Sequence, residues 1–143
     1  MDVGVLQESV LIEAIVDTRT QIDFIWQVFI TVHIALFALI FIYSEAVDRW
    51  NVLARIFALA GVAAFEYING TALVKAYLLL DALHDQYRTL YGQVERFQPK
   101  LYEYFVLAQY ADRPDMVMMT HGFAFAVVFI VLIARQLIHR AAR

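Results

Sequence analysis

The fold is indicated first by residues 24–44, FIWQVFITVHIALFALIFIYS, which contain no charged side chain. A membrane-spanning helix needs about 20 apolar residues to cross about 30 Å of hydrocarbon. A second charge-free stretch lies at residues 116–134, MVMMTHGFAFAVVFIVLIA. Between them, residues 56–80 form a mostly apolar stretch whose only charged residues are Glu66 and Lys75. The sequence therefore predicts three transmembrane helices, which we place at 22–44, 52–80 and 115–137.

The composition agrees with a chain surrounded by lipid. Hydrophobic residues make up 62% of the 143 positions and charged residues 17%, whereas soluble domains contain about 45–50% apolar residues. Eleven Lys and Arg against 14 Asp and Glu provide no basic field for nucleic acid, and no cysteine is present for disulfides or thiolate metal sites. We therefore expect an all-α integral membrane helical bundle that forms one domain over 1–143.

The segments outside the spans are also predicted to be helical. Residues 1–20 carry four acidic residues and no basic start, so they are not a signal peptide and are expected to form a short N-terminal helix. Thr20 and Asp23 have the spacing of a capping box before the first span, and Asn51 can cap the second. The connection at 81–113 is expected to be helical and interfacial, with a break at Pro99 and a first part that can continue the second span.

Basic residues suggest an orientation for the bundle. The short loop at 45–55 and the tail at 135–143 contain five Arg in 20 residues, whereas the N-terminal segment and the 81–115 connection contain five Lys and Arg in 58. Cytoplasmic segments are enriched in Lys and Arg. The count therefore predicts an N-terminus outside and a C-terminus in the cytoplasm.

Glu66 is the most informative polar residue, because ionisable side chains inside a membrane usually mark pathways or partners. It lies near the middle of the second span, with Asn69 on the same helical face, and His33 is at a similar depth in the first span. One hypothesis is a proton or cation site in a conduction path. The alternative is a neutral or paired Glu66 that bonds to His33 or Asn69 and only holds helices together.

A second polar set lies on the first span, where Asp23, Gln27 and Thr31 are spaced four residues apart. Side chains at this spacing share one helical face. They can line a water-filled vestibule of the ion pathway, or they can simply face the outer connection.

Small residues on the second span predict close helix packing. Gly61, Ala64 and Thr71 lie on the face that also carries Lys75, opposite Glu66. Small side chains let a neighbouring backbone approach closely. Because both faces then contact protein, we expect this span to be the centre of the bundle.

A metal site is a further hypothesis. Asp81, His84 and Asp85 share one helical face, and His121 can approach from the third span. Imidazoles with a carboxylate are ligands for Zn, Cu or Fe. The alternative is a solvated face at the end of the second helix.

These features leave three functional hypotheses. The first is an oligomeric channel or transport unit with Glu66 as its proton or cation site; since three helices enclose no adequate pore, copies would have to assemble. The second is an accessory subunit of a larger membrane complex. The third is a metal-dependent membrane enzyme or redox subunit using Asp81, His84 and His121.

The sequence has no glycine-rich phosphate loop and no G-x-S-x-G or H-E-x-x-H motif, which favours a non-enzymatic role. The expected partners are the lipid bilayer and other membrane subunits or copies of this chain, without nucleic acid.

Overall fold

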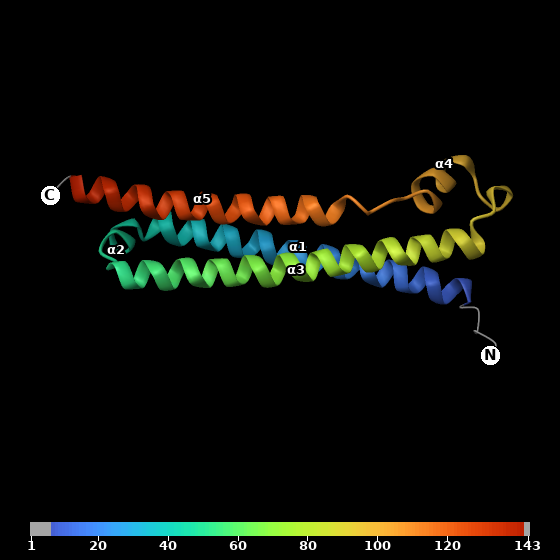
Figure 1. Ribbon diagram of the computed structural model, residues 1–143, viewed down its shortest axis with the longest axis horizontal. Coiled ribbons are helices and arrows are strands. Elements are labelled where there is room, and N and C mark those ends of the chain that lie inside the picture. The colour runs from blue at the N-terminus through green and yellow to red at the C-terminus, as the bar shows by residue number, and fades with distance from the viewer. Residues whose placement is uncertain (1–6, 142–143) are drawn as a thin grey trace.

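The computed structural model describes residues 7–141, with side chains placed as far as Ala134. This part of the chain contains helices and turns but no strand. Three long helices lie side by side along the molecule (Figure 1): α1 (Glu8–Ile42), α3 (Val52–Tyr91) and α5 (Arg113–Ala141). α1 and α5 run in one direction and α3 runs in the other. α3 packs against both of its neighbours, so it is the central helix of the bundle.

The two ends of the bundle differ. At one end, α2 (Ser44–Asp48) joins α1 to α3; we call this the α2 end. At the other end, α1 begins, α3 finishes and residues 92–112 connect α3 to α5; we call this the connection end.

α1 is one continuous helix, which differs from the sequence prediction of a short helix over 1–20 followed by a span starting at 22. No glycine or proline interrupts residues 8–42, so nothing in the local sequence stops the helix. The Thr20 hydroxyl donates to the Val16 carbonyl oxygen at 3.0 Å, as a residue inside a helix does, instead of capping a new one. Residues 1–6 of the predicted N-terminal helix lie outside the described residues.

α3 begins and continues as the sequence indicates. The Asn51 side chain accepts a hydrogen bond from the Ala54 N–H at 2.8 Å, which confirms it as the cap of this helix. The helix runs past residue 80, so the second span and the first part of the predicted connection are one element. It stops at Tyr91 instead of Pro99, because Gly92, a poor helix former, follows.

The rest of the connection consists of short turns. They are η1 (Val94–Arg96), α4 (Pro99–Leu101) and the π-helical turn η2 (Tyr102–Val106). Arg88 on α3 holds this segment by donating to the carbonyl oxygens of Val106 at 3.0 Å and Ala108 at 3.1 Å. The part of the predicted helical connection that follows Pro99 is therefore reduced to about two helical turns, and these pack on α3.

Two apolar cores hold the three helices together. The core of the connection half includes Leu11, Ile15, Leu73, Leu80, Tyr87 and Val106. The core of the α2 half includes Ile40, Val47, Val62, Val128 and Leu132. Between the two cores, the central part of the bundle contains the buried polar residues described below.

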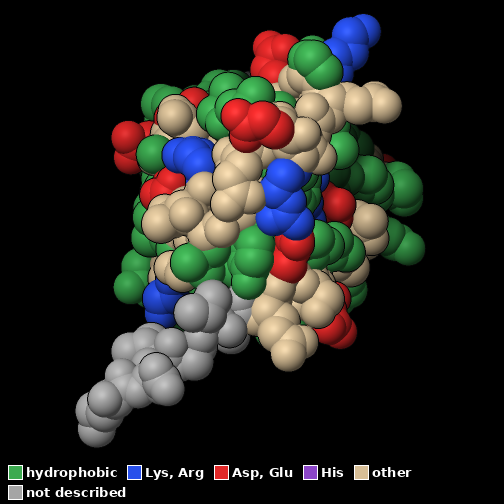
Figure 2. Space-filling view, turned by 90° about the vertical axis from the view of Figure 1, so that its right-hand side faces the viewer, with side chains coloured by type: hydrophobic (Ala, Val, Ile, Leu, Met, Phe, Trp, Pro, Cys, Tyr) green, Lys and Arg blue, Asp and Glu red, His purple; other side chains and the backbone are tan. Residues whose placement is uncertain are grey.

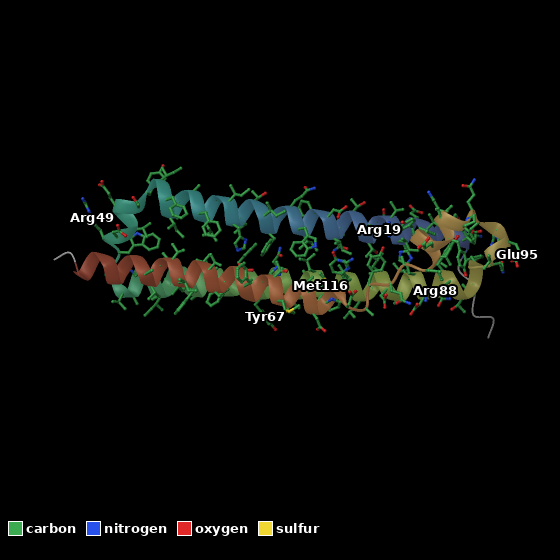
Figure 3. The ribbon with its side chains drawn as sticks, turned by 90° about the horizontal axis from the view of Figure 1, so that it is seen from above. Arg19, Arg49, Tyr67, Arg88, Glu95 and Met116 are labelled. Carbon is green, nitrogen blue, oxygen red and sulfur yellow. The ribbon has the colours of Figure 1, made fainter. Side chains whose placement is uncertain are left out.

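α1, α3 and the described part of α5 are each long and apolar enough to cross a membrane. Large apolar side chains point outward over their middle parts, Ile34, Phe57, Ile68 and Phe123 among them. Charged side chains gather at the ends: Figure 2 shows them over the connection end, and in Figure 3 Arg49 lies at the α2 end with Arg19, Arg88 and Glu95 toward the other. At 1.5 Å per residue, α1 and α3 are about 50–60 Å long, which exceeds the roughly 30 Å of hydrocarbon. In a bilayer, parts of α1 and α3 would therefore extend beyond the hydrocarbon.

Candidate functional site

Glu66 on α3 and His33 on α1 meet in the middle of the bundle. The Nε2 atom of His33 lies 2.8 Å from the Oε1 atom of Glu66. Both residues are buried, with 8% of His33 and 6% of Glu66 exposed. Among the described residues, neither carboxyl oxygen of Glu66 nor Nε2 of His33 has a hydrogen bond of standard geometry, so the 2.8 Å approach is a close polar contact between the two groups. The antiparallel packing of α1 on α3 thus brings together two of the residues that the sequence singled out.

The positions of the hydrogens in this pair can be inferred from the atoms that each group contacts. His33 Nδ1 lies 2.8 Å from the carbonyl oxygen of Phe29, which can only accept, so Nδ1 carries a hydrogen. A neutral imidazole then presents only a lone pair at Nε2, and an ionised Glu66 also presents only acceptors. The 2.8 Å contact therefore requires one proton between the two groups. That proton is held either by His33, as an imidazolium, or by Glu66, as a carboxylic acid.

Asn69 and His121 form a second polar contact beside this pair. His121 Nε2 lies 2.9 Å from the Oδ1 atom of Asn69, and the Asn69 amide group donates to the carbonyl oxygen of Ile25 at 3.4 Å. His121 fits here because Gly70 has no side chain: a Cβ atom at residue 70 would lie 3.3 Å from the imidazole ring. The sequence placed Asn69 near Glu66 but did not pair it with His121. Gly70, next to Asn69, was the sequence feature that could have indicated a close approach of another helix at this position.

Aromatic rings enclose both contacts. The Phe29 ring lies between the two imidazoles, with centroid distances of 4.2 Å to His33 and 4.5 Å to His121. On the side toward the connection end, the Trp26 indole donates a hydrogen bond to the Tyr77 hydroxyl at 3.1 Å. Such surroundings lower the local dielectric and strengthen the electrostatic coupling between the buried polar groups.

The polarity of the bundle changes along its axis on either side of Glu66. Toward the connection end, a cavity of about 260 Å³ is lined by Arg19, Asp23, Tyr77 and Tyr110, among others. Toward the α2 end, an apolar cavity of about 310 Å³ is lined by residues that include Leu36, Val62, Phe65 and Val128. Polar side chains therefore approach Glu66 from the connection end, and an apolar segment lies on its other side.

The second polar set predicted on α1 does not contact Glu66. Asp23, Gln27 and Thr31 are all exposed on the outside of α1, whereas His33 occupies its inner face. Asp23 reaches the polar cavity at the connection end. Within one chain, Gln27 and Thr31 face outward at the depth of the apolar span, so they do not line an internal vestibule.

The four predicted metal ligands are not brought together. Asp81 accepts a hydrogen bond from the Tyr110 backbone at 2.7 Å, His84 contacts the Phe105 carbonyl oxygen at 3.1 Å, and Asp85 pairs with Arg88 at 3.0 Å. His121 lies elsewhere, against Asn69. Over residues 7–134, no group of three or more His, Asp or Glu side chains has the geometry to hold a metal ion. Asp81 and His84 instead hold the connection to α3, because their side chains reach its backbone.

The small residues of the second span that were predicted to pack against a neighbouring helix are not covered by one in the described part of this chain. Gly61 and Ala64 are exposed and Thr71 is half-buried, and nothing lies within 4 Å of a Cβ atom placed on Gly61. Lys75 is exposed as well, and Gly61 borders the apolar cavity that residues of α1 and α5 also line. The small residue that permits close packing is Gly70.

Comparison with known proteins yields no relative: no family model, curated protein or solved structure matches this chain.

Proposed function

We propose that the protein is an oligomeric membrane transport unit for protons, with the His33–Glu66 pair as its proton site. The observation that carries this proposal is the buried 2.8 Å contact between the two side chains. One proton must lie between them, and either group can hold it. A buried pair with this property can accept and release a proton without a change of fold.

The surroundings of the pair support one-sided access. The polar cavity at the connection end provides a hydrated approach, with Tyr77 and then Asn69 between it and Glu66 along α3. The apolar cavity on the other side forms a barrier that prevents free leakage of protons. Passage through the whole membrane then requires a second route from Glu66 to the α2 end.

We also propose that several copies assemble, which would cover polar and small residues that a single chain leaves open. Gln27 and Thr31 are polar and exposed at the depth of the apolar span, where contact with lipid is unfavourable for polar groups. The Gly61 and Ala64 face of α3 is also open. Contacts between copies would cover both surfaces.

The proposal is tested by proton flux into liposomes that contain the purified protein and carry a pH gradient. We expect flux with the wild type and its loss with Glu66→Gln, which keeps the shape of the side chain but cannot ionise. Glu13→Gln is the matched control, because Glu13 is an exposed carboxylate on α1 away from the pair. Native mass spectrometry verifies that assembly is unchanged. Absence of flux with the wild type, or normal flux with Glu66→Gln, contradicts the proposal.

We also propose that the connection end lies outside the cell and the α2 end in the cytoplasm, from the distribution of Lys and Arg. The side chains of the basic tail at 135–143 lie outside those that the structure describes. Since the chain has no cysteine, single cysteines report sidedness cleanly. An impermeant maleimide should label Glu95→Cys in intact cells and Arg49→Cys only after permeabilisation. The opposite pattern reverses the orientation.

A further inference from the structure

His121 has an oxygen acceptor at each of its ring nitrogens. Nδ1 lies 2.9 Å from the carbonyl oxygen of Val117, and Nε2 lies 2.9 Å from Oδ1 of Asn69. A neutral imidazole carries one hydrogen, so it can donate to only one of these oxygens. Only an imidazolium, with hydrogens on both nitrogens, satisfies both contacts.

The orientation of the Asn69 amide supports this assignment. Its Nδ2 atom donates to the carbonyl oxygen of Ile25, which leaves Oδ1 for His121. Reversing the amide would direct Oδ1 at the Ile25 carbonyl and place two acceptors against each other. The two hydrogen bonds of Asn69 and the two of His121 are therefore satisfied together when His121 is cationic.

The environment of His121 also favours a cation. The Phe29 ring lies 4.5 Å away, between centroids, and aromatic rings attract cations. Glu66 on α3 interacts electrostatically with both His121 and His33. Among the described side chains of α5, the charged residues Arg113 and Asp115 are exposed at its start. Glu66 is thus the described carboxyl group that interacts with the charge of His121.

We propose that His121 is a second proton-binding group of this protein, with Asn69 as the acceptor that stabilises its cationic form. Together with the proton held between His33 and Glu66, each chain then binds two protons at adjacent positions around Phe29. His121 and Asn69 lie on the connection-end side of Glu66. The second proton-binding group extends the proposed function. Only the claim that its proton is transported rests on that function.

The test is the protonation state of His121, measured by NMR on protein with ¹⁵N-labelled histidines in lipid nanodiscs. His→Gln variants assign the four histidine signals. We expect hydrogens on both nitrogens of His121 near pH 7. His84 is an internal reference, because only its Nδ1 atom has an acceptor, Phe105 O, and we expect it to be neutral.

Two variants of Asn69 test whether its side-chain oxygen stabilises the cationic form of His121. Asn69→Leu removes the oxygen that faces Nε2, so the second hydrogen of His121 should be lost at the same pH. Asn69→Asp keeps an oxygen at that position and should preserve the imidazolium. A His121 signal with one protonated nitrogen at every pH where the wild type is folded overturns the proposal, and that spectrum decides even if Asn69→Leu does not fold. An imidazolium that persists in folded Asn69→Leu overturns the role of Asn69.

This experiment separates the inference from the proposed function. A cationic His121 in a protein without proton flux supports the second site and contradicts transport. Flux that depends on Glu66, with a neutral His121, supports transport and contradicts the second site.

Discussion

The imidazole of His33 and the carboxyl group of Glu66 are 33 residues apart in the sequence, and their Nε2 and Oε1 atoms are 2.8 Å apart in the structure. Each belongs to a different helix, and each is buried. A contact between a histidine and a glutamate at this depth joins α1 to the central helix through a shared proton. It therefore has both a structural consequence and a chemical one.

The structural consequence is measurable with a double-mutant cycle. Removing one partner of a buried ionic pair costs about 3–5 kcal/mol, because the other polar group stays buried without compensation. We expect His33→Leu and Glu66→Leu each to lower the free energy of unfolding in this way, and the double variant to lose clearly less than the sum. Unfolding in detergent or lipid measures the three differences. Additive losses would show that the two side chains do not interact.

Gly70 and Gly61 form a matched pair of glycines on α3. A methyl group on Gly70 would lie 3.3 Å from the His121 ring, whereas none of the described atoms lies within 4 Å of one on Gly61. Alanine in an open helical position is more favourable than glycine by about 1 kcal/mol, and overpacking costs about 1–3 kcal/mol. Measured on the dissociated single chain, Gly61→Ala should therefore raise the thermal stability and Gly70→Ala should not. Equal stability of the two variants would argue against close packing of His121 on α3.

Arg55 connects the α2 end to α5. It is buried, and it donates hydrogen bonds to the carbonyl oxygens of Leu132 at 2.7 Å and Val47 at 3.0 Å. An unpaired buried acceptor costs about 1–3 kcal/mol. We expect Arg55→Leu to destabilise the protein by at least about 2 kcal/mol and to expose residues 43–51 to protease. The exposed Arg49→Leu is the control and should change neither quantity.

The connection end should have a pH dependence of its own. Glu8 accepts hydrogen bonds from Arg96 at 2.8 Å and Tyr87 at 2.9 Å. Glu8 and Tyr87, whose pKa values this contact shifts, lie outside the apolar stretches 24–44 and 56–80. The hydrogen bond from Arg96, followed by that from Tyr87, lowers the pKa of Glu8 below its usual value. Burial, followed by the hydrogen bond to Glu8, raises the pKa of Tyr87 to about 12.

The signs of these shifts define the expected profile. The Glu8 contribution is present above the unfolded pKa of about 4.3 and is lost as the pH falls through the lower folded value. The Tyr87 contribution is present below about pH 10 and is lost as the pH rises toward the folded value. Hydrogen exchange of residues 8–12 across pH should show protection that decreases at both limits. Glu8→Gln should remove the acid-side decrease, and an unchanged profile would exclude this contact as its cause.

Several local features could be predicted from the sequence. The three apolar stretches follow from side-chain hydropathy alone, and the structure has a helix of sufficient length at each. The Asn51 cap also follows from local chemistry, because its partner is only three residues away. The boundary near residue 20 was wrong, since a capping pattern has no effect where the helix can simply continue.

Helical rise and hydropathy are local properties. The three long apolar helices, and the similar depths of Glu66, Asn69 and His33 within them, could therefore be predicted from the sequence. The tertiary structure alone decided which side chains meet. The rotation of each helix about its axis depends on neighbours that are distant in the sequence, and this rotation places Glu66 against His33 and Asn69 against His121. The same rotation leaves Gly61 and Ala64 open and separates Asp81 and His84 from His121. Helix spacing cannot reveal these outcomes, because they arise from packing between whole helices.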